Sequence, residues 1–283
     1  MPKTSQTTRT PAVQRLSTEA TPLALYRAGV APKSAKTLVL GHALGSDRHM
    51  WDQVLPDMPS DIQVILWEQP GHGQSGTLPS SALQGDQGVA AIAGSLRAGL
   101  QDVLGDDASL LYVAGLSLGG MVSLAFAQEF PETVAALAMF SSGPVLLPSN
   151  VWTDRAAAVR KDGLEPLVNG TMERWFSPGF ANGAGAEAVE RTRRTFLGTN
   201  PDGYAQCCDI IANTDLRPGV ATTNLPVAVV VGQDDPGMTP AQGEELVQAL
   251  PEGNLEVIAG ARHLTAVECP VQVSHQLLDF LKA

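Results

Sequence analysis

Short apolar runs and segments of helical periodicity alternate along most of the chain. Each apolar run is followed by a loop rich in Gly or other turn-forming residues, which is typical of strands buried on both faces of a sheet. The runs fall within residues 36–51, 62–76, 109–115, 133–144, 225–235 and 254–260, and two further short strands are expected within 12–29. Apolar residues recur at helical spacing in 89–104, 118–130, 240–250 and 271–282. This alternation predicts a mostly parallel sheet flanked by helices.

The alternation is interrupted once, between the strand that ends near residue 144 and the strand that begins near residue 225. The intervening segment has several amphipathic helical pieces and no clear apolar strand. We therefore predict an α/β core formed by residues 11–144 and 225–283, with a helical cap at 145–224. Residues 1–10 lack the apolar region of a secretory signal, and we expect them to form a short disordered tail.

Charge and composition narrow the classes of partner. The net charge is −11 and the pI is near 4.8, which disfavours nucleic acid because there is no basic stripe to release its counterions. No apolar run is long enough to span a membrane, and three cysteines give no disulfide framework. No CxxC or HExxH spacing is present, so we expect no structural or protease-type zinc site. We expect a soluble, cytoplasmic protein, and the sequence leaves open whether it forms a homo-oligomer.

The chain passes from a strand to a helix at "GLSLG", residues 115–119, with almost no loop between them. Such a turn presents the hydroxyl of Ser117 at the strand tip, and Gly115 and Gly119 let the chain pass without side-chain clashes. The plain alternative is a helix N-cap, for which serine is also favoured. The strand before and the helix after the serine favour a nucleophile.

A serine nucleophile needs a base and an acid that orients the base. Of the five histidines, His263 follows the last strand and should lie at the same sheet edge as Ser117. His42 and His72 precede the serine in Gly-rich loops that they are expected to support by hydrogen bonds. For the acid, "VVVGQDDPG" offers Asp234 and Asp235, of which we prefer Asp235.

An oxyanion formed at the substrate carbonyl needs backbone N–H donors. The first residue of the helix after the serine, Leu118, places one N–H beside the nucleophile. The loop "GHALG" at 41–45 follows the first buried strand, and within it we select the N–H of Leu44 as the second donor.

Five loop motifs, "GHALGSDRHMW", "EQPGHGQS", "GLSLGGM", "GQDDPGMTP" and "GARHLTAVECP", occur in the order found in the α/β-hydrolase fold family, which the chain resembles over nearly its whole length. The segments "VWTDRAAAVRKDGLEPLVNGTMERWFSPGF" and "TNPDGYAQCCDIIANTDLRPG" are similar to the cap of 3-oxoadipate enol-lactonases. The resemblance implies an α/β-hydrolase fold with a helical cap, a Ser117–Asp235–His263 triad and no cofactor. Two departures are Glu68, where the family usually has aspartate, and "HALG", which is closer to generic esterases.

An enol-lactone of this class also carries a carboxylate, so a cationic side chain in the cap would be useful. Arg155, Arg160, Arg174 and Arg217 are candidates, although most of them are expected to form surface ion pairs. Trp152, Arg155 and Trp175 are predicted to contact substrate, with core packing as the alternative for the tryptophans. A carboxylesterase, another lactonase and a hydrolase-fold ligand receptor with little turnover are the alternative functions.

Overall fold

A computed structural model describes residues 11–29, 36–79, 87–105, 110–146 and 148–283 of the chain. The predicted tail at 1–10 lies outside the described residues. The three cysteines are free; Cys207 and Cys208, which are adjacent in the sequence, are both buried. Among the described residues, we find no helix whose length and apolar character would let it cross a membrane.

Eight strands form one sheet in the order β1-β2-β4-β3-β5-β6-β7-β8. The pairs β1–β2 and β2–β4 are antiparallel, and all other neighbouring pairs are parallel. This confirms the predicted mostly parallel sheet. The strands are β1 (Val13–Leu16), β2 (Leu25–Ala28), β3 (Lys36–Gly41), β4 (Ile62–Trp67), β5 (Leu111–Leu116), β6 (Val134–Phe140), β7 (Val227–Gly232) and β8 (Gly253–Ile258).

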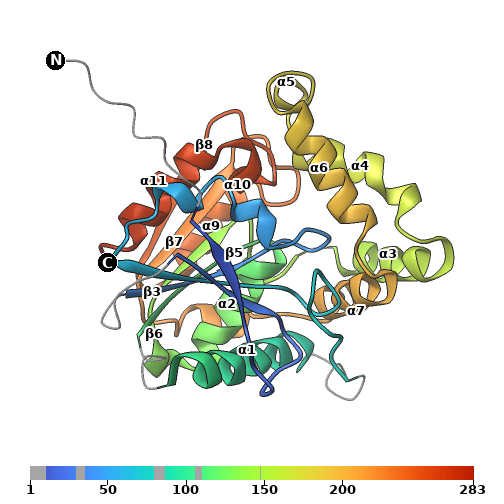
Figure 1. Cartoon of the computed structure of the whole chain (residues 1–283). Helices are drawn as coiled ribbons and strands as arrows, with labels where there is room; N and C mark the ends of the chain where they lie inside the picture. The colour runs from blue at the N-terminus through green and yellow to red at the C-terminus, as the bar shows by residue number, and fades with distance from the viewer. Residues whose placement is uncertain (1–10, 30–35, 80–86, 106–109, 147) are drawn as a thin grey trace.

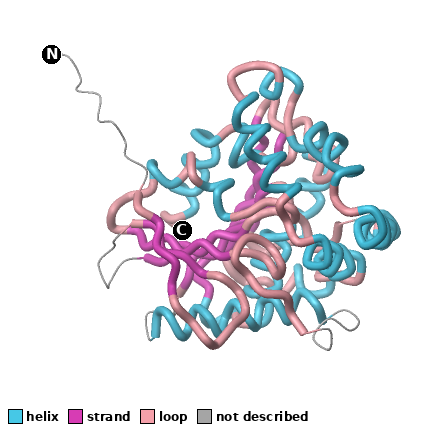
Figure 2. Tube along the Cα trace, turned by 45° about the vertical axis from the view of Figure 1, so that its right-hand side comes forward, coloured by secondary structure: helices cyan, strands magenta, loops and turns pink. Residues whose placement is uncertain are grey.

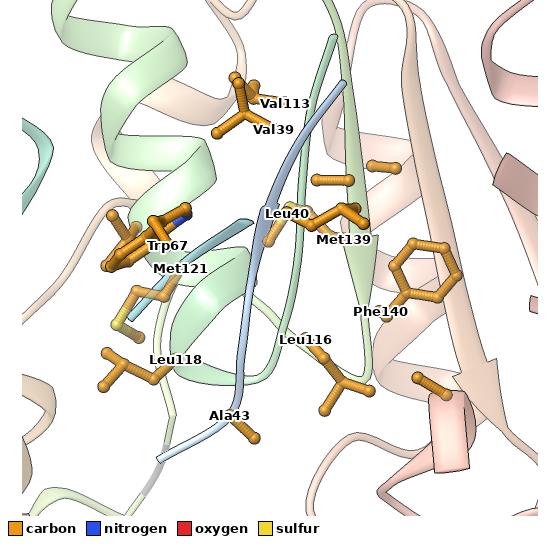
Figure 3. Packing of buried hydrophobic residues seen from close by; sticks show 14 of the residues in the cluster. Val39, Leu40, Ala43, Trp67, Val113, Leu116, Leu118, Met121, Met139 and Phe140 are labelled. Atoms are coloured by element: carbon orange, nitrogen blue, oxygen red, sulfur yellow. The ribbon is translucent and has the colours of Figure 1, made fainter. Parts of the chain in front are cut away.

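The central strands are apolar at successive positions because helices cover both faces of the sheet (Figure 2). Every residue of β5 is buried, and Figure 3 shows side chains of β3, β5 and β6 packed together with Leu118 and Met121. The main covering helices are α1 (Gly88–Leu104), α2 (Leu118–Glu129), α9 (Pro240–Ala249) and α11 (Pro270–Phe280).

The described residues between β6 and β7 form helices and no strand (Figure 1). We refer to residues 145–224 as the cap segment. Within it, the helices α3 (Ser149–Asp162) and α7 (Pro201–Ala212) pack extensively against each other. The cap segment touches the core where Gly203 lies against Gly71: a Cβ added at Gly203 would come 2.6 Å from the Gly71 Cα. The helices are α3 (Ser149–Asp162), α4 (Glu165–Trp175), α5 (Pro178–Ala181), α6 (Ala186–Leu197), α7 (Pro201–Ala212) and α8 (Arg217–Val220).

Parallel pairing brings the carboxyl ends of β3, β5, β6 and β7 to one edge of the sheet. In open α/β sheets, this edge is where ligand sites lie. The loops that follow these strands carry the predicted nucleophile, acid and oxyanion donors, so the topology alone places them near one another.

Candidate active site

Ser117 lies at a strained corner between β5 and α2. Its φ angle is +56°, in the left-handed region, which costs a non-glycine residue about 1–3 kcal/mol. The corner is tight enough that a Cβ added at Gly115 would come 2.2 Å from the Gly119 carbonyl carbon, and one added at Gly119 would come 2.5 Å from the Gly41 carbonyl. Both glycines are therefore required by close backbone approach.

Hydrogen bonds from β6 and the residues after it hold this corner in place. The Ser117 N–H donates to the Phe140 carbonyl at 2.9 Å, and the Ser142 hydroxyl donates to the Ser117 carbonyl at 2.7 Å. The Ser117 side chain caps no backbone N–H of α2, so the plain N-cap interpretation does not account for it. The hydroxyl instead faces a cavity.

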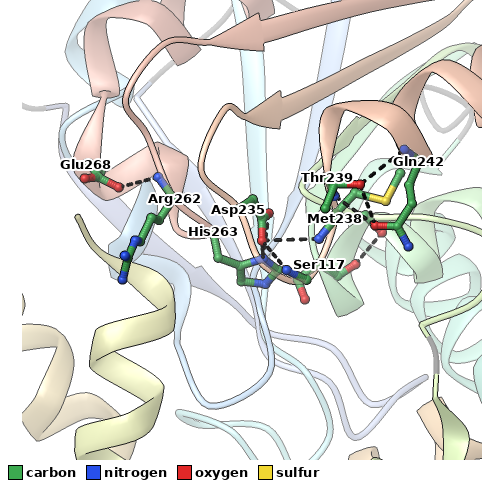
Figure 4. Close-up of polar contacts among 10 residues, drawn as sticks. Ser117, Asp235, Met238, Thr239, Gln242, Arg262, His263 and Glu268 are labelled. Carbon is green, nitrogen blue, oxygen red and sulfur yellow. Dashed lines mark hydrogen bonds and ion pairs between the residues drawn. The ribbon is translucent and has the colours of Figure 1, made fainter.

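His263 and Asp235 meet beside Ser117. The His263 Nδ1 atom lies 2.9 Å from one Asp235 carboxylate oxygen and 3.1 Å from the other. An ionised carboxylate only accepts hydrogen bonds, so Nδ1 must carry the proton and Nε2 is left as an acceptor. Figure 4 shows the imidazole ring between the Asp235 carboxylate and Ser117. This is the arrangement in which a histidine can accept the serine proton.

The environment of Asp235 keeps it ionised. Burial of this carboxyl group opposes ionisation, but the charge and hydrogen bond of His263 and the N–H of Gly237 outweigh burial and lower its pKa. The N–H groups of Gly237 and Met238 donate to Oδ1 at 2.8 and 3.2 Å. Asp234, by contrast, is exposed, so the structure places Asp235 and not its neighbour at the histidine, as the sequence analysis preferred.

The loop that carries Leu44 is held by two buried histidines. His72 Nε2 accepts the Gly45 N–H at 2.9 Å, while His42 Nε2 accepts the Gln69 N–H at 2.9 Å. Each histidine thus comes from one loop and binds the backbone of the other, in the supporting role expected from the sequence. Burial lowers the pKa of His42 to about 3 and that of His72 to about 4, so both rings are neutral near pH 7 and can accept these bonds.

The two predicted oxyanion donors lie on opposite sides of the nucleophile in sequence. Leu118 begins α2, whose first N–H groups have no partner within the helix, and Leu44 lines the cavity beside Ser117. Among the hydrogen bonds between described residues, neither the Leu44 N–H nor the Leu118 N–H is a donor. Both groups are free to bind an oxyanion.

A cavity of about 200 Å³ joins the predicted site residues to the cap segment. The predicted triad residues Ser117, Asp235 and His263 all line it, and so do the predicted substrate contacts Trp152, Arg155 and Trp175. Leu118 is the one predicted site residue that does not line it. The remaining lining residues are Ala43, Leu44, Leu146, Val151, Arg174, Tyr204, Pro236 and Gly237.

The four candidate arginines fall into two groups, two at the surface and two at the cavity. Arg160 forms an ion pair with Asp209 and Arg217 forms one with Asp215 at the surface, which is two of the four, where most were expected to do so. Arg155 and Arg174 line the cavity, and in the part of the chain that the structure describes neither of these two forms a salt bridge.

Both cavity arginines are fixed by neutral groups. Arg155 donates from Nε to the Tyr204 hydroxyl at 2.6 Å and from Nη2 to the Thr171 hydroxyl at 2.7 Å. Burial of Arg174, together with the nearby positive charge of Arg155, lowers the pKa of Arg174. The cavity therefore holds two positive charges that no carboxylate of the described residues pairs with.

The aromatic residues of the cavity have both packing and lining roles. Trp175 is buried, with its ring nearly perpendicular to that of Phe196, and the Trp152 indole N–H donates to the Leu146 carbonyl at 2.8 Å. Tyr204 was not selected from the sequence; its signal was a lone phenol on the buried side of a helical segment, which needs a hydrogen-bond partner. No group of three or more His, Cys, Asp or Glu side chains within the described ranges is placed to hold a metal ion.

Comparisons with known proteins agree with this architecture. A model of the alpha/beta hydrolase fold family matches residues 36–270. The chain is 30% identical to 3-oxoadipate enol-lactonase 2 of Acinetobacter baylyi over 261 residues, which cover 92% of this chain and 94% of that protein.

Two solved structures are similar over almost the whole chain. The enol-lactonase from Burkholderia xenovorans LB400 has a TM-score of 0.84 and 26% identity, covering 94% of this chain and 99% of its own. An esterase from Thermogutta terrifontis, solved with malate bound, has a TM-score of 0.83 and 25% identity, covering 96% and 98%. The chain belongs to the α/β-hydrolase fold family, as its motifs predicted.

Proposed function

We propose that this protein hydrolyses a small carboxylic ester or lactone that carries a carboxylate of its own, through an acyl-enzyme on Ser117. The best candidate substrate is 3-oxoadipate enol-lactone, since the similar proteins from A. baylyi and B. xenovorans bear enol-lactonase names. The same proposal assigns the reaction to aromatic catabolism in the cytoplasm.

The proposed chemistry begins with proton transfer from the Ser117 hydroxyl to His263 Nε2 as the oxygen attacks the substrate carbonyl carbon. Asp235 stabilises the resulting imidazolium through its bonds to Nδ1. The N–H groups of Leu44 and Leu118 donate hydrogen bonds to the developing oxyanion, a contribution worth about 2.7–4 kcal/mol for each donor in such sites.

Collapse of this intermediate breaks the bond between the acyl carbon and the ring oxygen. An enolate leaves, takes the proton from His263 and can tautomerise to a ketone, so ring closure is disfavoured. A water molecule then gives a proton to His263 Nε2 as its oxygen attacks the acyl carbon. His263 returns that proton to the Ser117 oxygen as the bond between this oxygen and the acyl carbon breaks, which releases the carboxylic acid and restores the serine hydroxyl. No cofactor is needed for any of these steps.

The observation that carries the proposal is the pair of arginines without carboxylate partners in the described chain, Arg155 and Arg174, in the same cavity as Ser117. A carboxylate on the substrate would offset one of the two positive charges and, bound by both guanidinium groups, would reduce their mutual repulsion. Arg–carboxylate bonds are charge-assisted and directional, so they would also fix the scissile carbonyl relative to Ser117. A substrate without a carboxylate would leave both charges uncompensated in a partly buried site.

A second candidate function is that of a general carboxylesterase. It is favoured by the mostly apolar remainder of the cavity wall, including Leu146, Val151 and Trp152, and by the similarity to the T. terrifontis esterase.

The two functions are separated by comparing kcat/KM for 3-oxoadipate enol-lactone with kcat/KM for p-nitrophenyl acetate, a neutral ester. We expect a preference for the lactone of at least a hundredfold, since charged hydrogen bonds contribute about 1.5–3 kcal/mol each. An equal or greater kcat/KM for the neutral ester would replace the lactonase proposal with the esterase.

A further inference from the structure

The loop that carries His263 is held from the sheet side by the loop that carries Asp235. The Asp234 N–H donates to the Ala261 carbonyl at 2.9 Å, and the Gln233 N–H donates to the Ile258 carbonyl at 2.9 Å. A Cβ added at Gly232 would come 2.3 Å from the Arg262 carbonyl oxygen. These contacts fix the distance between the two loops that form the Asp235–His263 pair.

The other side of the same loop is bound to the cap segment. The Leu264 N–H donates to the Trp175 carbonyl at 3.1 Å, and the Arg262 guanidinium donates to the Glu173 carbonyl. Both acceptors belong to the last turn of α4, which also carries Arg174. The turn that faces the substrate cavity is thus bonded directly to the residues on either side of His263.

One carboxylate, that of Glu268, bridges the loop that carries His263 and the segment that follows α4. Glu268 ends the short helix α10 (Thr265–Glu268) and is about nine-tenths buried, with 9% of its surface exposed. Its Oε2 accepts the N–H of Arg262 at 2.8 Å, as Figure 4 shows, and its Oε1 accepts the N–H of Ser177 at 2.9 Å. Arg262 directly precedes the histidine, and Ser177 lies two residues beyond the end of α4.

We propose that Glu268 is a positioning residue, which aligns His263 with Ser117 by joining the histidine loop to the end of α4. The inference rests on the proposed role of His263 as the base. The bridge by Glu268 also couples substrate binding to the base, because the last turn of α4 carries Arg174 and is joined by Glu268 to the histidine loop.

The chemistry of the bridge requires a carboxylate. Glu268 must accept two backbone N–H bonds at once, and an ionised carboxylate offers acceptors only on both oxygens. A glutamine there keeps one acceptor and turns an NH2 group toward the second N–H, so one bond is replaced by two opposed donors. A displacement of the base by about 1 Å costs on the order of a hundredfold in rate.

The bridge can be broken by a substitution at either of its two ends. Glu268→Gln removes one acceptor without changing the size of the side chain. Ser177→Pro removes the donor at the cap end and leaves Glu268 intact; the φ of Ser177 is −67° and the ψ of Phe176 before it is 142°, both of which suit proline. Because Ser177 also caps the Phe180 N–H, Ser177→Ala is the matched control for the lost hydroxyl. Glu132→Gln, at the opposite edge of the sheet, controls for the lost charge.

The test measures two quantities on folded protein: the rate constant for covalent labelling of Ser117 by a fluorophosphonate, and kcat and KM for p-nitrophenyl acetate. We expect Glu268→Gln and Ser177→Pro to lower the labelling rate and kcat about tenfold to a hundredfold, with KM within twofold and circular dichroism unchanged. Both controls should stay within twofold of the unmodified chain.

Two results would overturn the inference. One is a labelling rate and a kcat within twofold of the unmodified chain in both bridge variants; the other is a loss that matches the fraction of unfolded protein, which would show a structural role only. Failure of the proposed function is a distinct result, because the unmodified chain itself would then not be labelled at Ser117.

Discussion

His263 donates from Nδ1 to Asp235 at 2.9 Å, while the neighbouring Asp234 carboxylate faces solvent. We therefore predict that Asp235→Asn lowers kcat about ten-thousandfold, because an amide at this position favours the wrong tautomer of the imidazole. Steady-state hydrolysis of p-nitrophenyl acetate checks this. Asp234→Asn is the matched control and should stay within threefold; comparable losses in the two variants would contradict the assignment of the acid.

The two cavity arginines give a prediction about substrate selectivity. Arg155→Gln and Arg174→Gln should each lower kcat/KM for the carboxylate-bearing lactone about tenfold to a hundredfold, since each removes a charged hydrogen bond worth about 1.5–3 kcal/mol. Activity on p-nitrophenyl acetate should change less than threefold. The measurement is the ratio of the two kcat/KM values in each variant.

Arg160→Gln provides the control for this pair, because its guanidinium is paired with Asp209 at the surface. The ratio should stay at the value of the unmodified chain. Equal losses on the charged and neutral substrates in the Arg155 and Arg174 variants would show that these side chains support the cap and do not select the substrate.

The corner at Ser117 predicts a large stability effect at one glycine. A Cβ at Gly115 would lie 2.2 Å from a backbone carbon of α2, so Gly115→Ala should destabilise the fold by about 3 kcal/mol or more. Gly94, within α1, has no atom within 4 Å of such a Cβ, and Gly94→Ala should stabilise by about 0.5–1 kcal/mol. Urea unfolding of both variants measures these changes, and a destabilisation of Gly115→Ala below about 1 kcal/mol would show that the corner relaxes.

Buried His72 predicts a pH dependence of stability. Burial lowers its pKa from the ordinary value of 6.5 to about 4, so between these values the unfolded chain binds a proton that the folded chain does not. The free energy of unfolding is therefore highest above pH 6.5, and this group alone lowers it by up to about 1.4 kcal/mol for each pH unit below. Acid sensitivity should thus be weaker in His72→Gln, whose amide oxygen can still accept the Gly45 N–H.

Urea unfolding at pH 7.5, 6 and 5 follows this effect. The difference in stability between the unmodified chain and His72→Gln should narrow as the pH falls. The exposed His275 supplies the control: the free energy of unfolding of His275→Gln, plotted against pH, should run parallel to that of the unmodified chain. Parallel curves for His72→Gln as well would mean that His72 is not held neutral by burial.

Features set by local chain geometry could be predicted from the sequence. The apolar runs specify strands buried on both faces, and the elbow at Ser117 follows from two glycines around a serine between a strand and a helix. The sequence also places an acid in the loop after β7, but it is burial beside His263 that distinguishes Asp235 from the exposed Asp234.

Features that depend on how the cap helices pack could not be predicted from the sequence. Arg155 and Arg174 lie on different helices, and what distinguishes them from the surface arginines is that the packing of these helices places both at the cavity that Tyr204 of α7 also lines. Arg160 and Arg217 form surface ion pairs instead. One bond of the bridge joins the Glu268 side chain to the backbone N–H of Ser177, which is 91 residues away in the sequence. No periodicity or motif in the sequence encodes a contact of that kind.

The central claim is that hydrolysis passes through an acyl group on Ser117. The most direct measurement is intact-mass and peptide-mapping mass spectrometry after treatment with a fluorophosphonate, combined with turnover of Ser117→Ala. We predict a single adduct on Ser117 and, in the folded alanine variant, a loss of about a millionfold in kcat. An adduct on another residue, or more than about a thousandth of the activity remaining in Ser117→Ala, would contradict the account.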